Sequence, residues 1–211
     1  MKVLLINGSP NEHGCTDAAL REAAKTLTEA GIGTDFFWIG KKPISGCIAC
    51  QQCGRLDECV FGDKVNELVS LAAGYDGFLF GSPVYFSGMN GSMMSFMDRA
   101  FYSASRRKEG DPFRFKPAAA VVSARRAGTT SALDQMNKYF LYDQMPVVPS
   151  RYWNMVHGNT PDEVRQDEEG LQIMRTLGRN MAWMLRLREA GDRAGIPLPE
   201  QEPRIGTNFI R

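Results

Sequence analysis

Short apolar runs alternate along the chain with longer segments whose apolar residues recur at helical spacing. Residues 2–7 form the first run and stop at Asn-Gly-Ser-Pro, which predicts a buried strand that ends in a turn. From Thr16 to Ala30 the apolar residues follow the i, i+3, i+4, i+7 spacing of an amphipathic helix, and Gly31 is a helix stop. Four more apolar runs predict strands at residues 35–39, 77–81, 118–123 and 145–149.

Helices are predicted from the same periodicity between and after these strands. Asp63 is the expected N-cap of one helix, and Gly191 is the expected end of the last. The tail at 196–211 is rich in proline and polar residues, so we expect it to be loosely held or used in a subunit contact. The predicted helices after the first lie at about residues 63–72, 91–102, 129–144 and 161–190.

Strands that alternate with crossover helices build a parallel sheet with helices on both faces. The chain has 211 residues, 43% of them hydrophobic, which suits one domain with one core. We therefore predict an α/β fold over residues 1–195. Its expected form is a doubly wound, five-stranded parallel sheet with the flavodoxin-like strand order 2-1-3-4-5.

Charge and hydropathy exclude several classes of partner. The formal net charge is only +1, so no strong positive field is available to attract nucleic acid or an anionic membrane. No apolar run approaches the ~20 residues that a membrane-spanning helix needs. The chain enters its first strand at once, without a signal peptide, so the expected location is cytoplasmic.

The loop between the first strand and the first helix, Gly8–Thr16, has the features of a phosphate site. Backbone N–H groups at the positive end of a helix bind anions, Ser9 and Thr16 add hydroxyl donors, and Gly14 relieves crowding. Cys15 is expected to offer its backbone amide. The loop lacks both the Gly-Lys-Ser/Thr end of a triphosphate loop and the G-x-G-x-x-G dinucleotide pattern. An ordinary strand-to-helix turn is the alternative.

A second small-residue loop follows the strand at 77–81. Pro83 restricts its backbone, Tyr85 and Phe86 supply apolar faces, and Gly88 permits a close approach. A flat tricyclic ring needs such a wall together with backbone donors at its polar edge. The loop therefore favours a flavin, although the aromatic rings are equally compatible with a role in the core.

The third loop, Ser123–Thr129, is expected to approach the same pocket through Ser123, Arg125, Arg126 and Gly128. A cation near N1 and O2 of a reduced flavin raises the electron affinity of the ring. Either arginine can instead pair with the extra phosphate of NADPH, because guanidinium groups bind phosphate bidentately. A surface pair without a ligand is the third reading of these two charges.

These motifs resemble those of the NADPH-dependent FMN reductase and iron–sulfur flavoprotein group. The resemblance spans roughly residues 1–150 and rests on Gly-Ser-Pro in the 8–16 loop, Gly-Ser-Pro-Val-Tyr-Phe at 81–86 and the helix ending Phe-Met-Asp-Arg at 96–99. One departure is Cys15 before Thr16, where the family often has asparagine. A backbone contact survives that change, and an asparagine side-chain contact does not. The resemblance implies FMN, with its phosphate at Ser9, Asn11, Cys15 and Thr16 and its ring near Pro83, Val84, Tyr85, Phe86, Ser87 and Gly88.

Four of the five cysteines are clustered with the spacing C-x2-C-x2-C-x5-C, at Cys47, Cys50, Cys53 and Cys59. Four thiolates on short turns match a [4Fe–4S] cluster, and the spacing resembles the compact motif of iron–sulfur flavoproteins. Zinc is the alternative metal, although its usual pattern is two separated C-x2-C pairs. Free or redox-active thiols without a metal are the other reading.

The leading functional hypothesis is an FMN oxidoreductase that passes electrons from NAD(P)H to a small-molecule acceptor such as a quinone, flavin or azo compound. No side chain is assigned as a catalytic acid or base, because the cofactor carries the chemistry. Neither histidine, His13 or His157, has a visible partner. The alternatives are an iron–sulfur electron carrier that takes electrons from ferredoxin, and a dedicated biosynthetic flavin dehydrogenase. The apolar helix at 91–102 suggests a homodimer or homotetramer.

Overall fold

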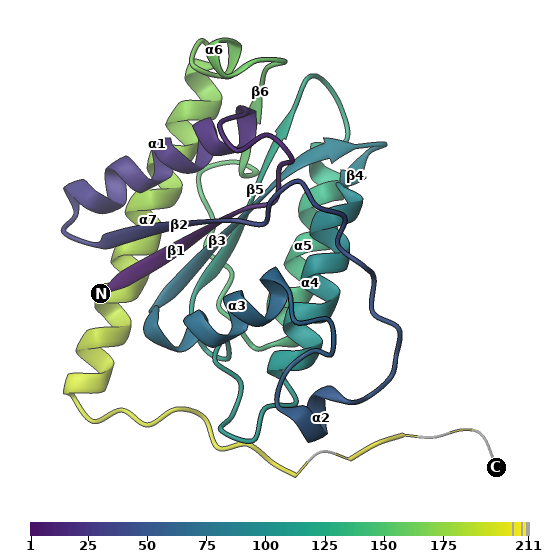
Figure 1. Cartoon of the computed structure of the whole chain (residues 1–211). Helices are drawn as coiled ribbons and strands as arrows, with labels where there is room; N and C mark the ends of the chain where they lie inside the picture. Colours follow the sequence, from purple (N-terminus) through teal and green to yellow (C-terminus); the bar gives the residue numbers. More distant parts are fainter. Residues whose placement is uncertain (204, 208, 210–211) are drawn as a thin grey trace.

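A central sheet of parallel strands organises the computed structural model, which describes residues 1–203, 205–207 and 209 (Figure 1). The strands run in the order β2-β1-β3-β5-β6. A two-residue strand, β4 (Gly88–Met89), pairs antiparallel with the end of β3. Counted over the parallel strands, this is the predicted flavodoxin-like order. The bounds are Lys2–Asn7 (β1), Gly33–Trp38 (β2), Gly77–Tyr85 (β3), Ala118–Ala124 (β5) and Met155–His157 (β6).

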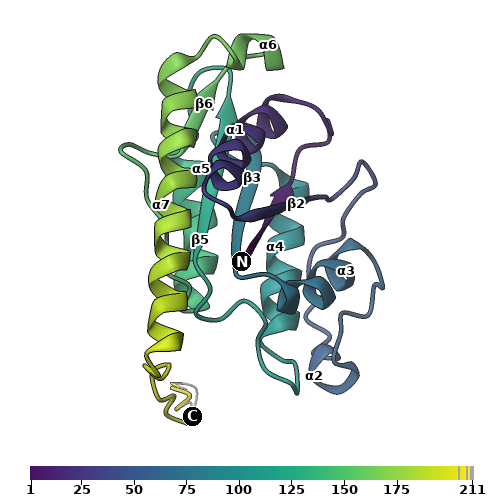
Figure 2. The same ribbon diagram turned by 90° about the vertical axis from the view of Figure 1, so that its left-hand side faces the viewer.

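Helices cover both faces of the sheet, as Figure 2 shows from the side. Alternate residues of β1 point to opposite faces: Val3 and Leu5 pack with one set of helices, and Leu4 and Ile6 with the other. Strands buried on both faces read as continuous apolar runs, which is why the three central strands β1, β3 and β5 were visible in the sequence. The first set comprises α1 (Cys15–Glu29), α6 (Pro161–Val164) and α7 (Glu168–Arg193); the second comprises α3 (Lys64–Leu71), α4 (Gly91–Ala104) and α5 (Thr129–Tyr142).

The strand predicted at 145–149 is wrong. Only Val147 forms a bridge there, with Ala118 at the start of β5, and the fifth parallel strand is β6. Pro146 and Pro149 lack the N–H donors that a continuous ladder needs, so pairing stops after one bridge. The chain then leaves the sheet and returns to pair beside the other end of β5.

The last predicted helix is also corrected. It is interrupted at residues 165–167, where Asp167 accepts from the N–H of Gly170 at 2.9 Å and starts α7 as a new helix. The helix passes through Gly191 and ends at Arg193, and Gly195 takes the left-handed conformation with φ +71°. A glycine inside a helix is tolerated, so Gly191 was a weak stop signal.

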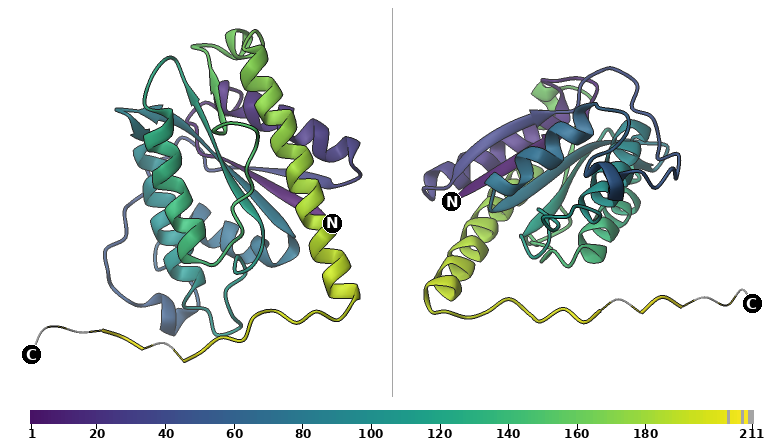
Figure 3. Two further views of the ribbon diagram at one scale, coloured as in Figure 1. Left: turned by 180° about the vertical axis from the view of Figure 1, so that it is seen from behind. Right: turned by 60° about the horizontal axis from the view of Figure 1, so that its bottom comes forward.

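The segment after α7 is extended and exposed wherever the structure describes it, and it runs beneath the molecule (Figure 3). A side-chain hydrogen bond from Gln144 Nε2 to Gln201 Oε1, at 2.8 Å, joins the described part of this segment to the domain. A role for this tail in a subunit contact stays a prediction. In the described ranges, no helix combines the length and apolar character that crossing a bilayer requires.

Candidate FMN-binding site and cysteine segment

Side chains at the end of β1 shape the predicted phosphate loop. Asn7 Oδ1 accepts from the Ser9 N–H at 3.0 Å, and its Nδ2 donates to the carbonyl of Glu12 at 2.9 Å. Ser9 Oγ accepts from the Asn11 N–H at 3.1 Å. From the end of β2, Trp38 Nε1 donates to the Ser9 carbonyl at 2.7 Å. Side chains from β1, from β2 and from the loop itself therefore hold the loop through hydrogen bonds to its backbone.

The loop leads into α1, whose N-terminus has no side-chain cap. Gly14 is the N-cap of α1 and has no side chain to offer, and within the described residues the N–H groups of Cys15, Thr16 and Asp17 have no hydrogen-bond partner. These amides lie at the positive end of a 15-residue helix. Asp17 places a carboxylate in the first turn, and Arg21 pairs with it at 2.7 Å. The three free amides at the start of α1 suit a bound phosphate.

Direct contacts bring the three predicted segments together. The N–H of Gly8 donates to the carbonyl of Gly81 at 2.8 Å, which joins the first loop to β3. The hydroxyls of Thr16 and Ser123 lie 2.9 Å apart, which joins the start of α1 to the end of β5. These contacts lie at the edge of the sheet formed by the carboxyl ends of its parallel strands, where ligands bind in open α/β sheets.

Cys15 contributes to this edge through its backbone. Its sulfur lies 3.6 Å from the carbonyl oxygen of Gly158, beyond β6, so the thiol points away from the first loop. Burial raises the pKa of the Cys15 thiol. The departure from asparagine at this position therefore leaves the amide available and uses the side chain for packing.

The segment predicted to be a loop beside the flavin ring is instead a β-hairpin, so this prediction is corrected. Gly81 to Tyr85, including Pro83 and Val84, continues β3, and Tyr85 pairs with Gly88 of β4. Phe86 and Ser87 are the two turn residues of this hairpin, with φ +48° and +59°, as a type I′ turn requires. The Phe86 ring is fully exposed. The two turn positions have neither the glycine nor the asparagine that usually indicates this geometry, so the hairpin has no local sequence signal.

The hairpin packs against the third loop at Gly128. This residue has φ +92°, and a Cβ atom there would lie 2.5 Å from Cα of Ser87. A glycine is therefore required both by the backbone conformation and by the close approach. Arg125 and Arg126 are exposed beside it, and neither side chain makes a hydrogen bond or ion pair with any described residue.

Asn90 supports the site and was missed by the sequence reasoning. Its Oδ1 accepts from the N–H of Met93 at 2.8 Å and caps α4, while its Nδ2 donates to the Gly8 carbonyl at 2.8 Å. Its own N–H donates to Ser82 Oγ at 3.1 Å. One buried amide therefore connects β3, α4 and the first loop. An asparagine directly before a helical pattern is an N-cap signal, but its contact with a distant loop has no local signature.

An additional cleft of about 1090 Å³ adjoins the first loop between the end of β2 and α3. Trp38 and Phe36 line it, together with charged side chains of both signs, among them Lys42 and Glu67. His13 also lies here, 3.5 Å from Asp17. The cleft was not predicted, because its walls come from separate parts of the chain.

The four clustered cysteines all line one small pocket, whose apolar walls include Ile48, Val60 and Phe61. Cys53 is buried at the start of the short helix α2 (Cys53–Leu56), Cys59 is half-buried, and Cys47 and Cys50 are exposed. Burial raises the pKa of the Cys53 thiol. Across the described part of the chain, no three or more cysteine, histidine or acidic side chains are gathered closely enough to hold a metal ion. The donor types fit an iron–sulfur cluster, but closing them on one requires rearrangement of the segment.

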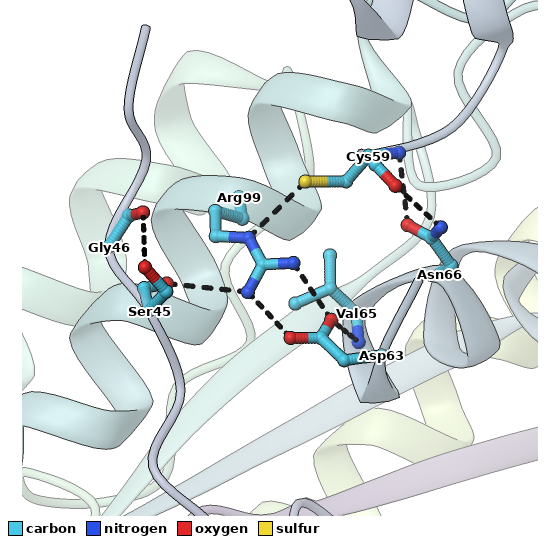
Figure 4. Close-up of polar contacts among 7 residues, drawn as sticks. All are labelled: Ser45, Gly46, Cys59, Asp63, Val65, Asn66 and Arg99. Atoms are coloured by element: carbon cyan, nitrogen blue, oxygen red, sulfur yellow. Dashed lines mark hydrogen bonds and ion pairs between the residues drawn. The ribbon is translucent and has the colours of Figure 1, made fainter. Parts of the chain in front are cut away.

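An ion pair next to this pocket fixes its inner wall. Asp63 caps α3, as predicted, by accepting from the N–H of Val65 at 3.1 Å. Arg99 of α4 binds both Asp63 carboxylate oxygens, at 2.7 and 2.8 Å (Figure 4). Burial alone would raise the pKa of Asp63, but the hydrogen bonds from Arg99 and Val65 and the Arg99 charge outweigh it and lower the pKa. In the sequence, Arg99 is notable only as the last residue of the motif at 96–99.

Comparison with known proteins decides the family. A sequence model described as NADPH-dependent FMN reductase matches residues 1–160. The chain belongs to the NADPH-dependent FMN reductase family. It is also 32% identical over 196 residues to an iron–sulfur flavoprotein of Methanocaldococcus jannaschii, a match that covers 89% of this chain and 98% of that protein. The predicted family is thus confirmed: this is a flavin-dependent oxidoreductase family, and FMN is its cofactor.

Solved structures with this fold include RosB, determined with the intermediate 8-demethyl-8-formylriboflavin-5'-phosphate bound. The TM-score is 0.68 at 12% identity, over 100% of this chain and 92% of that one. A flavodoxin from the Archaea gives a TM-score of 0.57 at 16% identity, over 88% and 99%. At these identities the likeness is one of fold, and it agrees with the predicted flavodoxin-like class.

Proposed function

We propose that this member of the FMN reductase family transfers electrons from NAD(P)H to a small-molecule acceptor, such as a quinone, a flavin or an azo compound. The observation that carries the proposal is the meeting of three loops around the uncapped N-terminus of α1. FMN supplies hydride and single-electron transfer when it is bound. Every remaining task, which is to bind, orient and shield, falls to the residues of this chain.

The phosphate of FMN is assigned to the amides of Cys15 and Thr16, with hydroxyls nearby from Ser9 and Thr16. Gly8, Asn90 and Ser82 keep this loop in register with β3 through buried hydrogen bonds. The ring is assigned to the surface that the hairpin and the third loop form together, through Pro83, Val84, Tyr85, Gly88 and Gly128. Tyr85 and Phe86 are exposed and face solvent, so they are available to an acceptor.

We assign the binding of the electron donor, NADPH, to Arg125 and Arg126. Both guanidinium groups are exposed beside the hairpin and pair with no described side chain, so their charge is available for an anion. Guanidinium binds phosphate bidentately, and NADPH carries one phosphate more than NADH. We expect Arg126→Ala to raise the KM for NADPH about tenfold and the KM for NADH by much less. Steady-state kinetics with both donors measure this; equal changes would remove the assignment.

A second candidate function follows from the cysteine pocket. Four thiols line one cavity, and the relative aligned over nearly its full length is named an iron–sulfur flavoprotein. On this alternative Cys47, Cys50, Cys53 and Cys59 hold a [4Fe–4S] cluster, which supplies one-electron transfer when bound, and ferredoxin is the donor. Iron and acid-labile sulfide analysis of anaerobically prepared protein tests the cluster. Rates of flavin reduction by NADPH and by reduced ferredoxin then separate the two functions.

We also propose that the active protein is a homodimer or homotetramer. An apolar cleft of about 450 Å³ lies between α4 and α5, with Phe101, Tyr139 and the exposed Tyr142 in its lining. An unpartnered apolar groove of this kind marks an association surface in many proteins. Sedimentation across a range of concentrations measures the oligomeric state. A fully active monomer would rule this part out.

A further inference from the structure

One buried arginine joins the two ends of the cysteine segment to the helix behind it. The Arg99 side chain extends from α4 and is 1% exposed. Its Nη1 donates to the carbonyl of Ser45, just ahead of Cys47, and its Nε donates to the Cys59 sulfur, both at 3.3 Å (Figure 4). The chain before the first cysteine and the sulfur of the last are therefore held by the same guanidinium.

The direction of the N–H that Cys59 receives is fixed by Asp63. Both terminal nitrogens of Arg99 bind this carboxylate in a planar fork, which leaves the Nε–H aimed at the sulfur. The Phe61 ring, centred 4.5 Å from the guanidinium carbon, covers the group. A lysine at this position keeps the charge but has a single nitrogen, so it cannot serve carboxylate, carbonyl and sulfur in the same geometry.

The backbone of Cys59 is held as firmly as its sulfur. Its N–H donates to Asn66 Oδ1 at 3.0 Å, and its carbonyl accepts from Asn66 Nδ2 at 2.8 Å (Figure 4). In contrast, Cys47 and Cys50 are exposed, and their sulfurs make no hydrogen bond with any described residue. Hydrogen bonds therefore hold the Cys59 thiol in position, whereas the Cys47 and Cys50 thiols are not held in this way.

We propose that Arg99 is a positioning residue that anchors Cys59 as the first ligand of the cluster and sets the reduction potential of that cluster. The inference rests on the second candidate function above, in which the four cysteines hold a [4Fe–4S] centre. Hydrogen bonds to ligating sulfurs and the local net charge are among the levers on such a potential. An N–H donated to sulfur favours the reduced, more negative state. Asp63 opposes this effect by balancing the guanidinium charge.

Two substitutions separate the hydrogen bond from the charge. Arg99→Lys keeps the positive charge and removes the Nε–H to sulfur, so we expect the cluster to become harder to reduce. Asp63→Asn keeps an oxygen that can cap α3 and accept from Arg99, whose guanidinium is also held by the Ser45 carbonyl. The substitution leaves the guanidinium charge uncompensated, so we expect easier reduction. Each change is expected to shift the one-electron equilibrium about tenfold, which corresponds to ~59 mV, in opposite directions.

The control is Arg107→Lys. Arg107 pairs with Asp57 of the same segment at 3.8 Å and makes no hydrogen bond to a cysteine of the described chain, so the potential should not change. The measurement is an EPR-monitored redox titration of holoprotein, with bound FMN and circular dichroism reporting on the fold. A variant that keeps FMN but takes up no iron supports the anchoring role. Equal potentials in all variants, or shifts of Arg99→Lys and Asp63→Asn in the same direction, would overturn the proposal.

Wild-type iron and sulfide analysis keeps the two proposals apart. If the wild-type protein takes up neither element under anaerobic reconstitution, the cluster itself fails, and with it the second candidate function. If the wild-type cluster forms and its potential is indifferent to Arg99 and Asp63, only the role of Arg99 fails. The FMN reductase activity proposed for the three loops is unaffected by either result.

Discussion

One buried carboxyl group outside the candidate site, that of Asp143, has a strongly raised pKa. It lies just after α5, is 1% exposed, and no described residue donates a hydrogen bond to either of its carboxyl oxygens when both it and Asp111 are ionised. Burial, together with the charge of the neighbouring Asp111, raises the pKa of Asp143 to about 8. In the folded protein, this pair therefore retains a proton near neutral pH.

The raised pKa of Asp143 is expected to make the protein less stable at higher pH. An unfolded aspartate releases its proton near pH ~3.9, so between about pH 4 and 8 the folded state binds more protons than the unfolded one. The free energy of unfolding therefore decreases as pH rises through this window. Asp143→Asn is neutral throughout, and we expect it to stabilise the protein by roughly 1–3 kcal/mol at pH ~8 and to differ little at pH ~4. Urea unfolding across this range measures it; a difference independent of pH would contradict the raised pKa.

At the scale of elements, the β3–β4 hairpin carries the clearest local strain. Both of its turn residues, Phe86 and Ser87, take positive φ without being glycine or asparagine, and such a conformation costs roughly 1–2 kcal/mol per residue. Because the Phe86 ring is fully exposed, it gains no packing within the chain in return. Bulky residues held in this way cluster at functional sites.

We therefore expect the double substitution Phe86→Asn, Ser87→Gly to raise the free energy of unfolding by about 1–2 kcal/mol, because Asn-Gly suits a type I′ turn. Thermal unfolding, with Phe86→Ala as the control for loss of the ring alone, measures this. Acceptor turnover is expected to fall in both variants if the ring serves the acceptor. A destabilised double variant would show that the turn is not strained.

The elements of this fold could be predicted where local signals and buried patterns agree. The parallel order followed from apolar runs alternating with helical spacing, and Asp63 followed from its place before a helix. The hairpin could not be predicted, because Phe86 and Ser87 are atypical turn residues whose conformation is imposed by β3 and β4. The 145–149 segment was wrongly predicted as a strand, because an apolar run between prolines has a strand-like pattern but lacks the backbone N–H donors that a strand needs for pairing.

At the scale of the whole molecule, the candidate site depends on contacts between distant segments. The residue types of the three loops were visible in the sequence, but Thr16 meeting Ser123 and Asn90 reaching Gly8 are long-range contacts. The same holds for Arg99 and the ends of the cysteine segment. Sequence patterns located the chemistry, and the parallel sheet brought the three loops, but not the cysteine segment, to one edge.

The most direct test of the account compares FMN with riboflavin, which lacks the phosphate, in calorimetric titrations of the flavin-free protein. Because the amides at the start of α1 have no other partner in the described structure, we expect one FMN per chain and an affinity for riboflavin at least about tenfold weaker. Equal affinity for the two flavins, or no uptake of FMN at all, would contradict the claim that these loops form a flavin phosphate site.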